Sequence, residues 1–254
     1  MPTSQRFPAD IARSYRGIER SAAETRHLLG FDPIEPLSGR ECMRRLGRMR
    51  IVAGSKLLAV AYGVRKLGRG VEASTYYDPE TERLAIDLSI ETYRGLTGWP
   101  REDVRARFAF CHELGHAALH GAELTRFARL SRSELEVLRH SGSSAVTGSR
   151  DVEWQANAFS SSLLMPAAGL ERLEADGRLN EQEVCQWFHV SRSSAVIRAE
   201  VFRRRRQELL GAWVNEGGPK WQAHAKTTWP RTRQKAAILG EDGPNFNTLK
   251  FFLP

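Results

Sequence analysis

Residues 111–120 read Cys-His-Glu-Leu-Gly-His-Ala-Ala-Leu-His, and His112, Glu113 and His116 form the pattern HExxH within them. Four residues turn an α-helix by about 400°, so two histidines with this spacing lie on one face, roughly 6 Å apart along the axis. Two such imidazoles can chelate one zinc ion. Glu113, one residue after the first ligand, lies beside the metal rather than on it, which is the position of a general base.

The surrounding residues predict that this pattern lies on an apolar helix. The acidic residues of Pro100-Arg101-Glu102-Asp103 are typical of a first helical turn, and Gly121 is a typical stop. Between them the segment is rich in Phe, Leu and Ala. Because burying two histidines and a glutamate without a partner costs free energy, a metal site explains the pattern better than surface hydrogen bonding does.

A catalytic zinc ion needs a third protein ligand and an open fourth position. A third histidine in the arrangement HExxHxxGxxH is excluded, because Leu119 and Ala122 occupy the required Gly and His positions. His120 lies too far along a continuous helix to reach the same ion. We interpret it as a helix-terminal histidine near the last carbonyl groups.

A second predicted helix, residues 151–164, supplies a glutamate instead. It contains Glu153-Trp154-Gln155-Ala156-Asn157, in which Glu153 and Asn157 share one face. Glu153 is therefore the candidate third ligand, and Asn157 is the residue that would orient a ligand histidine through its second ring nitrogen. Asp151 stands at the expected start of the helix and is better explained as an N-cap.

Together these motifs resemble the ImmA/IrrE metallopeptidases, whose pattern is HELGHxxLH, then ExEANxFA, then LLMP. In this chain the second motif begins at Glu153, the third is Leu163-Leu164-Met165-Pro166, and the likeness covers residues 100–170. Gln155 stands where the family often has a second acid, which supports Glu153 as the ligand. Cys111 replaces a small apolar residue, and we interpret it as a small buried side chain.

The resemblance implies a zincin-like fold in which His112, His116 and Glu153 hold zinc and Glu113 is the catalytic base. It also implies a role in transcription. Proteins of this family cleave, or otherwise inactivate, a helix-turn-helix repressor and so relieve repression.

The expected fold class is α+β, with a small antiparallel sheet beside the HExxH helix and the glutamate helix. A hairpin is predicted in which residues 74–77 and 83–88 flank a turn at Asp78-Pro79-Glu80-Thr81. The other predicted helices span residues 9–29, 39–46, 179–188 and 192–210. The predicted domains are a zincin-like metallopeptidase domain over residues 1–166, a helix-turn-helix-like segment over residues 167–210 and a basic extension over residues 211–254.

The last two predicted helices have helix-turn-helix proportions, with His189-Val190-Ser191 as the turn. In a DNA-binding unit, Arg192, Ser193 and Arg198 would face phosphates or base edges. The alternative is that the helix pair packs onto the peptidase domain or docks a repressor. We interpret Arg203-Arg204-Arg205-Arg206 as a solvated helix end.

The composition excludes several classes of protein. The chain has 254 residues, of which 41% are hydrophobic and 27% charged, as in ordinary globular proteins. No apolar run approaches the roughly 20 residues of a membrane span, and the N-terminal segment lacks the apolar core of a secretory signal. Three scattered cysteines exclude a disulfide scaffold, so we expect a cytoplasmic protein. The net charge of +8 favours an acidic partner, either nucleic acid or protein.

Two hypotheses of function follow. The first is a zinc-dependent endopeptidase that cleaves a specific partner protein, a helix-turn-helix repressor or an antitoxin-like protein. The second is a non-proteolytic zinc-binding regulator that sequesters a repressor or binds DNA through its basic C-terminal half. In the first, a strand of the hairpin holds an extended substrate. An oxyanion stabiliser is also needed, and Tyr76, Tyr77, Tyr93 and His140 are candidates among which the sequence does not choose.

Overall fold

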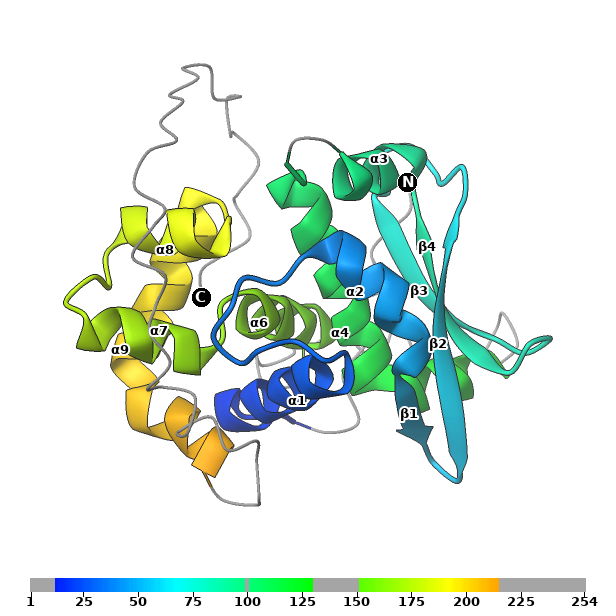
Figure 1. The fold of residues 1–254 in the computed structure, drawn as a ribbon. Helices are drawn as coiled ribbons and strands as arrows, with labels where there is room; N and C mark the ends of the chain where they lie inside the picture. The colour runs from blue at the N-terminus through cyan, green and yellow to red at the C-terminus, as the bar shows by residue number, and fades with distance from the viewer. Residues whose placement is uncertain (1–11, 99–100, 130–150, 215–254) are drawn as a thin grey trace. The chain divides into compact units, whose positions relative to one another are not determined.

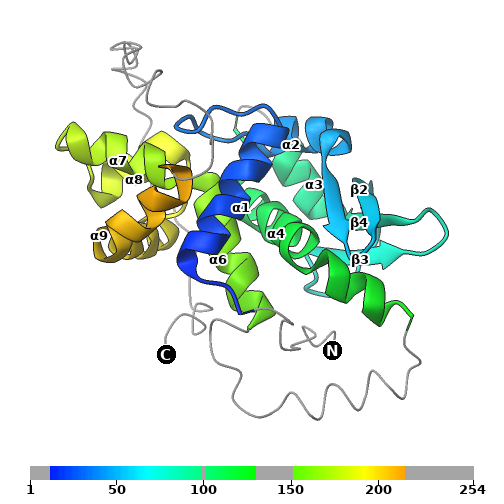
Figure 2. The same cartoon turned by 90° about the horizontal axis from the view of Figure 1, so that it is seen from below.

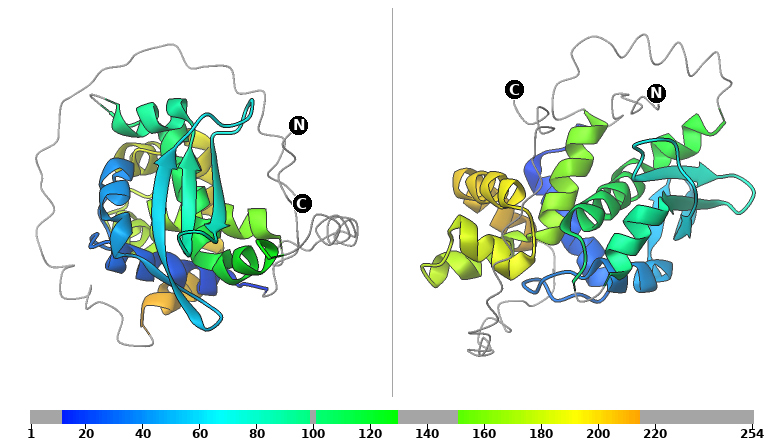
Figure 3. Two further views of the ribbon diagram at one scale, coloured as in Figure 1. Left: turned by 90° about the vertical axis from the view of Figure 1, so that its right-hand side faces the viewer. Right: turned by 90° about the horizontal axis from the view of Figure 1, so that it is seen from above.

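The computed structural model describes residues 12–98, 101–129 and 151–214. These residues form an α+β fold with eight α-helices, one short 3₁₀ helix and a four-stranded sheet, as the fold-class prediction expected. The helices lie on one face of the sheet (Figure 1), and the left view of Figure 3 shows the sheet in front with the helices behind it.

The chain divides into two compact units, residues 1–219 and residues 220–254. The second unit lies outside the described residues. The domain boundaries at residues 166 and 210 stay predictions. Among the described helices, none combines the length and the apolar character needed to cross a bilayer.

The sheet is mixed rather than antiparallel. In space the strands follow the order β1-β2-β4-β3, and their bounds are β1 (Arg50–Ala53), β2 (Lys56–Val64), β3 (Ala73–Asp78) and β4 (Arg83–Leu88). The β3–β4 hairpin is antiparallel and confirms the predicted hairpin, but β2 and β4 pair in parallel, with Val60 opposite Leu84. The predicted antiparallel sheet was wrong because no local signal announces a pairing between non-consecutive strands. As a result, β3 lies at one edge of the sheet.

The α-helices of the N-terminal half begin at side-chain caps, and the bounds of these helices are α1 (Tyr15–Leu28), α2 (Gly39–Arg45), α3 (Ile90–Thr97) and α4 (Val104–Phe127). The short 3₁₀ helix η1 (Leu46–Arg48) follows α2. Ser14, Ser38, Ser89 and Asp103 each accept a hydrogen bond from a backbone N–H in the first turn. The first helix therefore starts at Tyr15 rather than at residue 9, and residues 9–11 lie outside the described part of the chain.

The second half of the described chain is helical. It contains α6 (Val152–Leu164), α7 (Ala167–Ala175), α8 (Glu181–Phe188) and α9 (Arg192–Val214). The Asp151 side chain accepts a hydrogen bond from Glu153 N at 2.9 Å, which confirms the predicted N-cap of the glutamate helix. His189 follows the last residue of α8 as its C-cap and has a left-handed backbone, with φ 54° and ψ 47°. Glycine is the usual residue in this conformation at the end of a helix.

Helix α6 packs against both α4 and α1 (Figure 2), and the shared interface is apolar. Phe110 and Leu114 of α4 and Phe159 and Leu163 of α6 are fully buried. Cys111 is also fully buried, as predicted for a small core side chain, and the three cysteines of the chain are free thiols. This core fixes the position of α6 relative to the HExxH helix.

A buried ion pair ties α9 to the rest of the unit. Arg198 donates to the Glu19 carboxylate on α1 at 2.6 Å and to the carbonyl of Met165 at 3.0 Å. Glu19 also accepts from Ala167 N at 2.8 Å. Arg198 is only 3% exposed, so it does not face outward as a DNA-binding unit would require, and its contacts fit the alternative in which the helix pair packs onto the rest of the unit. The Arg198 side chain therefore helps to pack α9 against α1, because its carboxylate partner, Glu19, is buried.

The turn between α8 and α9 is held by the HExxH helix. The guanidinium of Arg107 on α4 donates to the carbonyls of Leu37 and Phe188, at 3.3 and 2.6 Å, and to that of His189. The helix pair is therefore packed against α1 and α4. Arg192 and Ser193 are exposed, and Arg192 is ion-paired with Glu181. The run Arg203–Arg206 is exposed as predicted, and the helical backbone of α9 is interrupted within it, at Arg205, where φ is −126° and ψ is 21°.

Candidate metal centre

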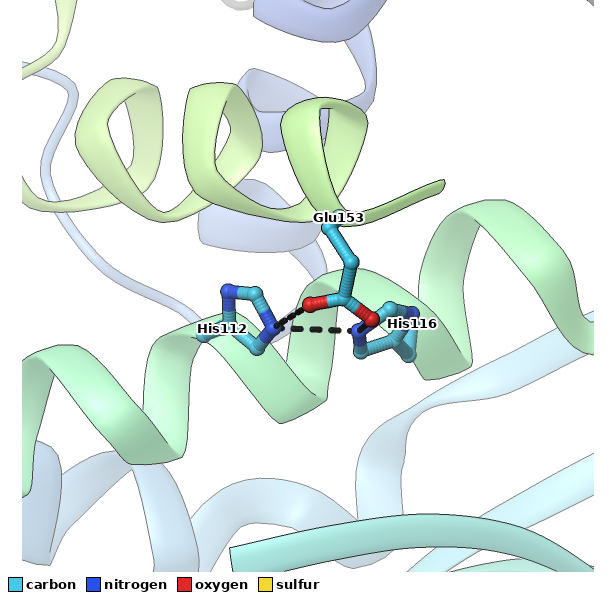
Figure 4. Close-up of side chains that lie close together, drawn as sticks. All are labelled: His112, His116 and Glu153. Carbon is cyan, nitrogen blue, oxygen red and sulfur yellow. Dashed lines mark hydrogen bonds and ion pairs between the residues drawn. The ribbon is translucent and has the colours of Figure 1, made fainter. Parts of the chain in front are cut away.

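Three predicted ligands converge between α4 and α6. Figure 4 shows His112 and His116 on one face of α4, with Glu153 reaching down from the first turn of α6. The two Nε2 atoms are 3.0 Å apart. The Glu153 carboxylate lies 3.3 Å from His112 Nε2 and 3.6 Å from His116 Nε2. One ligand atom from each residue can be chosen so that all three lie within 4.8 Å of one another.

This donor set fits a metal ion. Ligand atoms about 2.0–2.1 Å from a tetrahedral zinc ion are about 3.3 Å from one another, close to the spacings of 3.0–3.6 Å found here. Two imidazoles and one carboxylate leave a fourth position open, as in catalytic rather than structural zinc sites. The three side chains are between 13% and 27% exposed, so the centre is reachable from solvent.

A glycine lets the two helices approach closely enough to bring these ligands together. A Cβ atom on Gly115 would stand 3.2 Å from both the Cα and the carbonyl oxygen of Ala156, and 3.1 Å from the Phe159 ring. Only a residue without a side chain leaves the contact free of strain. At the outer end of α6, Trp154 packs edge-on against Tyr15 of α1, with ring centroids 5.1 Å apart. The helix that carries Glu153 is thus fixed on both sides.

Glu113 faces the edge strand of the sheet, and its partner there was missed by sequence reasoning. The hydroxyl of Thr75 on β3 lies 2.7 Å from Glu113 Oε2 and 2.9 Å from the Glu113 carbonyl oxygen. Burial raises the pKa of Glu113, although the His112 charge and the Thr75 hydrogen bond oppose the shift. A raised pKa brings a carboxylate closer to the range in which a general base works at neutral pH.

Two polar residues orient the ligand histidines from behind. Asn157 Oδ1 lies 2.9 Å from His112 Nδ1, so the residue predicted to orient a ligand histidine does contact one. His120 Nδ1 lies 3.1 Å from His116 Nδ1, and its Nε2 lies 3.0 Å from Gln155 Oε1. Hydrogen bonds of this kind commonly hold the rings of metal-binding histidines.

The interpretation of His120 as a helix-terminal residue near the last carbonyl groups holds for the backbone, which departs from helical geometry at this residue, but not for the side chain. Helix α4 continues past Gly121 to Phe127, and His120 sits at a kink with φ −120° and ψ 19°. Its side chain is fully buried rather than close to the last carbonyls. The exclusion of His120 as a third ligand agrees with the structure, in which the ligand group consists of His112, His116 and Glu153 among the described residues.

The electrostatics of the centre favour a neutral His116 and an ionised Glu153, whereas they favour the protonated form of His112. Burial, reinforced by the neighbouring His112 charge, lowers the pKa of His116 to about 3. Burial likewise lowers the pKa of His120 to about 4. Burial opposes a charge on Glu153, yet its hydrogen bond to His112 and the charges of the histidines lower its pKa. For His112, burial is outweighed by the hydrogen bond to Glu153 and the charges of Glu113 and Glu153, so its pKa is raised.

Of the candidate oxyanion residues, Tyr76 lies on the far face of the sheet from Glu113. Tyr76 follows Thr75 along β3, so its side chain points to the opposite face of the sheet, where it hydrogen-bonds Asp87. Tyr77 is buried and Tyr93 lies on α3. His140 lies outside the described residues.

Comparison with known proteins agrees with the motifs. Residues 102–200 match the peptidase M78 family, described as the IrrE N-terminal-like domain. Among solved structures, the chain is similar to a Mycobacterium tuberculosis transcriptional regulator, with 15% sequence identity and a TM-score of 0.44. The match covers 75% of this chain but 48% of that protein, so the chain spans about half its length. No curated protein sequence matches the chain significantly. The matched segment, residues 102–200, contains both motifs and the candidate metal-ligand group, so this part of the chain is similar to the IrrE N-terminal-like domain.

Proposed function

We propose that this protein is a zinc-dependent endopeptidase that cleaves one specific cytoplasmic partner, a helix-turn-helix repressor or an antitoxin-like protein, and so relieves repression. The observation that carries the proposal is the convergence of His112, His116 and Glu153. A second carboxylate, Glu113, lies beside them on α4, the helix that carries both histidines. Two imidazoles and a carboxylate with an open position are the donor set of many zinc peptidases. The identity of the partner rests on the family resemblance.

Zinc in this centre would supply Lewis-acid chemistry toward a peptide carbonyl and would make a nearby water more acidic. Glu113 would then move the proton. Its Oε2 accepts the Thr75 hydrogen bond, so Oε1 is the atom that takes a proton from the attacking water. The same carboxyl group passes that proton to the leaving amine. Asn157 and His120 keep the two imidazole rings oriented during these steps.

The edge strand β3 is well placed to hold an extended substrate. Among the described strands it has a neighbour on one side only, and it carries Thr75, which contacts Glu113 directly. A peptide that pairs with the free edge of β3 would therefore pass beside the proposed base. Main-chain pairing of this kind binds a peptide with little dependence on its sequence. Selectivity for one partner would then come from contacts outside the strand.

Co-expression with the candidate repressor tests the proposal. A candidate helix-turn-helix repressor is produced together with the wild-type protein, with Glu113→Gln, or with Glu200→Gln as a matched control on the exposed face of α9. Intact-mass analysis then reports any fragments. We expect fragments with the wild type and the control, but none with Glu113→Gln, because loss of a general base typically slows a reaction about 10²–10⁴-fold.

Two outcomes would contradict the proposal. A zinc-loaded Glu113→Gln variant that still produces the same fragments would show that Glu113 is not the base. An intact repressor that co-purifies equally with wild type and Glu113→Gln would favour sequestration without cleavage. Zinc content, measured by atomic emission on both proteins, shows whether the variant kept its metal.

A further inference from the structure

We infer that His120 and Gln155 are positioning residues that set the tautomer of His116 through a chain of two hydrogen bonds with one required direction. The inference rests on the metal site of the proposed function and adds two residues to it. Its requirement is chemical and specific: position 120 must accept a hydrogen bond from His116, and position 155 must accept one from His120.

The direction of the chain follows from the ring atoms that face the centre. His116 Nε2 lies 3.0 Å from His112 Nε2 and 3.6 Å from the Glu153 carboxylate, so Nε2 is the atom available to a metal. A metal takes the lone pair of that nitrogen, and a neutral imidazole carries its one proton on the other nitrogen. His116 must therefore carry its proton on Nδ1.

Among the described residues, the hydrogen-bond partner of His116 Nδ1 is the His120 ring, so His120 must accept this proton. Nδ1 of His120 lies 3.1 Å away and accepts only if it carries no proton itself. The proton of His120 is then on Nε2, which lies 3.0 Å from Gln155 Oε1. The amide oxygen must accept this second hydrogen bond, because the amide nitrogen can only donate. Reversing either bond would put the His116 proton on Nε2 and block the metal.

The backbone of α4 is shaped to make this chain. Its regular helical geometry is interrupted at His120 itself, four residues after His116. The next residue, Gly121, has no room for a side chain, since a Cβ there would stand 3.0 Å from Ile51 and 3.2 Å from Leu84. The helix thus changes direction at the residue whose ring bridges α4 and α6, and it continues against the sheet.

Burial makes the hydrogen bonds consequential. His120 and Gln155 are both fully buried, so ring and amide atoms without partners would lose hydrogen bonds to water that nothing replaces. The two ligand histidines are therefore held differently: His112 contacts the amide of Asn157 directly, whereas His116 reaches the amide of Gln155 through a second imidazole. If His120 only filled space, an apolar side chain of similar size would serve equally well.

Zinc affinity, measured independently of cleavage, tests the inference. Metal-free full-length proteins are titrated with Zn²⁺ against a chelator of known affinity. His120→Leu removes the acceptor, whereas His120→Asn places an amide oxygen near the position of Nδ1. Gln155→Leu and Gln155→Glu form the corresponding pair at the other residue. His27→Leu, on the exposed surface of α1, is the control for loss of a histidine elsewhere.

We expect His120→Leu and Gln155→Leu to bind Zn²⁺ about 10- to 100-fold more weakly than wild type, the usual effect of losing a residue that orients a ligand histidine. His120→Asn and Gln155→Glu should stay within about threefold of wild type, because both keep an acceptor. The visible absorption bands of the Co²⁺-loaded protein should change in the leucine variants and be restored in His120→Asn. Circular dichroism of the metal-free proteins checks that each variant is folded.

Specific results would overturn the inference. Wild-type zinc affinity in folded His120→Leu would show that no acceptor is needed. Equal weakening in folded His120→Asn and His120→Leu would show that ring volume matters instead. If the His120 variants fail to fold, the Gln155 pair decides by the same comparison. A wild-type protein that binds Zn²⁺ while all variants match it overturns this inference alone, whereas a wild-type protein that binds no Zn²⁺ overturns the proposed function as well.

Discussion

Gly115 of α4 and Ala156 of α6 meet at a helix crossing that is too tight for an unstrained Cβ atom: one on Gly115 would lie 3.2 Å from Ala156 Cα. We expect Gly115→Ala to push α6 outward, to weaken zinc binding and to lower the free energy of unfolding by about 1–3 kcal/mol, as overpacking does. Urea unfolding and zinc titration measure both effects. Gly211→Ala is the control, because nothing lies within 4 Å of its Cβ in α9. There the better helix propensity of alanine should stabilise by up to about 1 kcal/mol. Equal effects at both positions would contradict the close-approach argument.

The buried pair of Glu19 and Arg198 predicts a strong asymmetry between single and double substitutions. Arg198→Met leaves the Glu19 carboxylate buried without its cation and should lower the free energy of unfolding by about 3–5 kcal/mol. Adding Glu19→Leu should recover part of this loss. Denaturant unfolding of the four proteins of this cycle gives the coupling energy. Arg204→Ala removes an exposed pair with Glu200 and should change stability by less than about 1 kcal/mol. Additive effects at Glu19 and Arg198 would mean that the two charges do not interact.

Because the Thr75 hydroxyl contacts Glu113, we expect its removal to lower activity without unfolding the protein. Thr75→Val keeps the shape of the side chain but removes the hydrogen bond to Glu113, so a misplaced base should lower kcat about 10- to 100-fold. Thr75→Ser keeps the hydroxyl and should retain most of the activity. Cleavage rates of the partner, with zinc content and thermal melting as controls, make the comparison. A serine variant as slow as the valine variant would assign the effect to the methyl group and to packing.

Zinc addition should stabilise the protein measurably. A ligand present at 100 times its Kd adds about 2.7 kcal/mol to the free energy of unfolding, which corresponds to a rise in Tm of roughly 5–10 °C for a domain of this size. Glu153→Gln and His116→Ala should lose most of this rise, whereas Glu200→Gln should keep it. Thermal melts with Zn²⁺ and with excess chelator measure the difference. An equal rise in all variants would place the stabilising ion elsewhere.

The candidate metal centre was the most predictable part of the molecule, because the arrangement of its residues within each helix follows from helical spacing. Helical spacing places His112 and His116 on one face of α4, and it places Glu153 and Asn157 on one face of α6. Asp151 was predicted as a cap from its position alone, and the structure agrees. In each case the identity and spacing of a few neighbouring residues were sufficient to place the side chain.

The missed features all depend on contacts between distant segments. Thr75 meets Glu113 only because β3 lies at the sheet edge beside α4, and the parallel pairing of β2 with β4 decides that arrangement. The side-chain partner of His120 was missed because Gln155 lies on α6, 35 residues later, and no local rule connects the two. The burial of Arg198 was missed because its acidic partner lies 179 residues earlier.

That separation also has a consequence for how the protein is made. On the ribosome, Glu19 emerges long before Arg198, and at about 5–20 residues per second the interval is roughly 10–35 s. Throughout this time the site that α9 will occupy on α1 is open, and the carboxylate lacks its cation. Native docking of α1 and α9 must therefore follow synthesis of nearly the whole described chain. The nascent chain would stay incompletely assembled, and open to chaperones and proteases, until translation had passed residue 198.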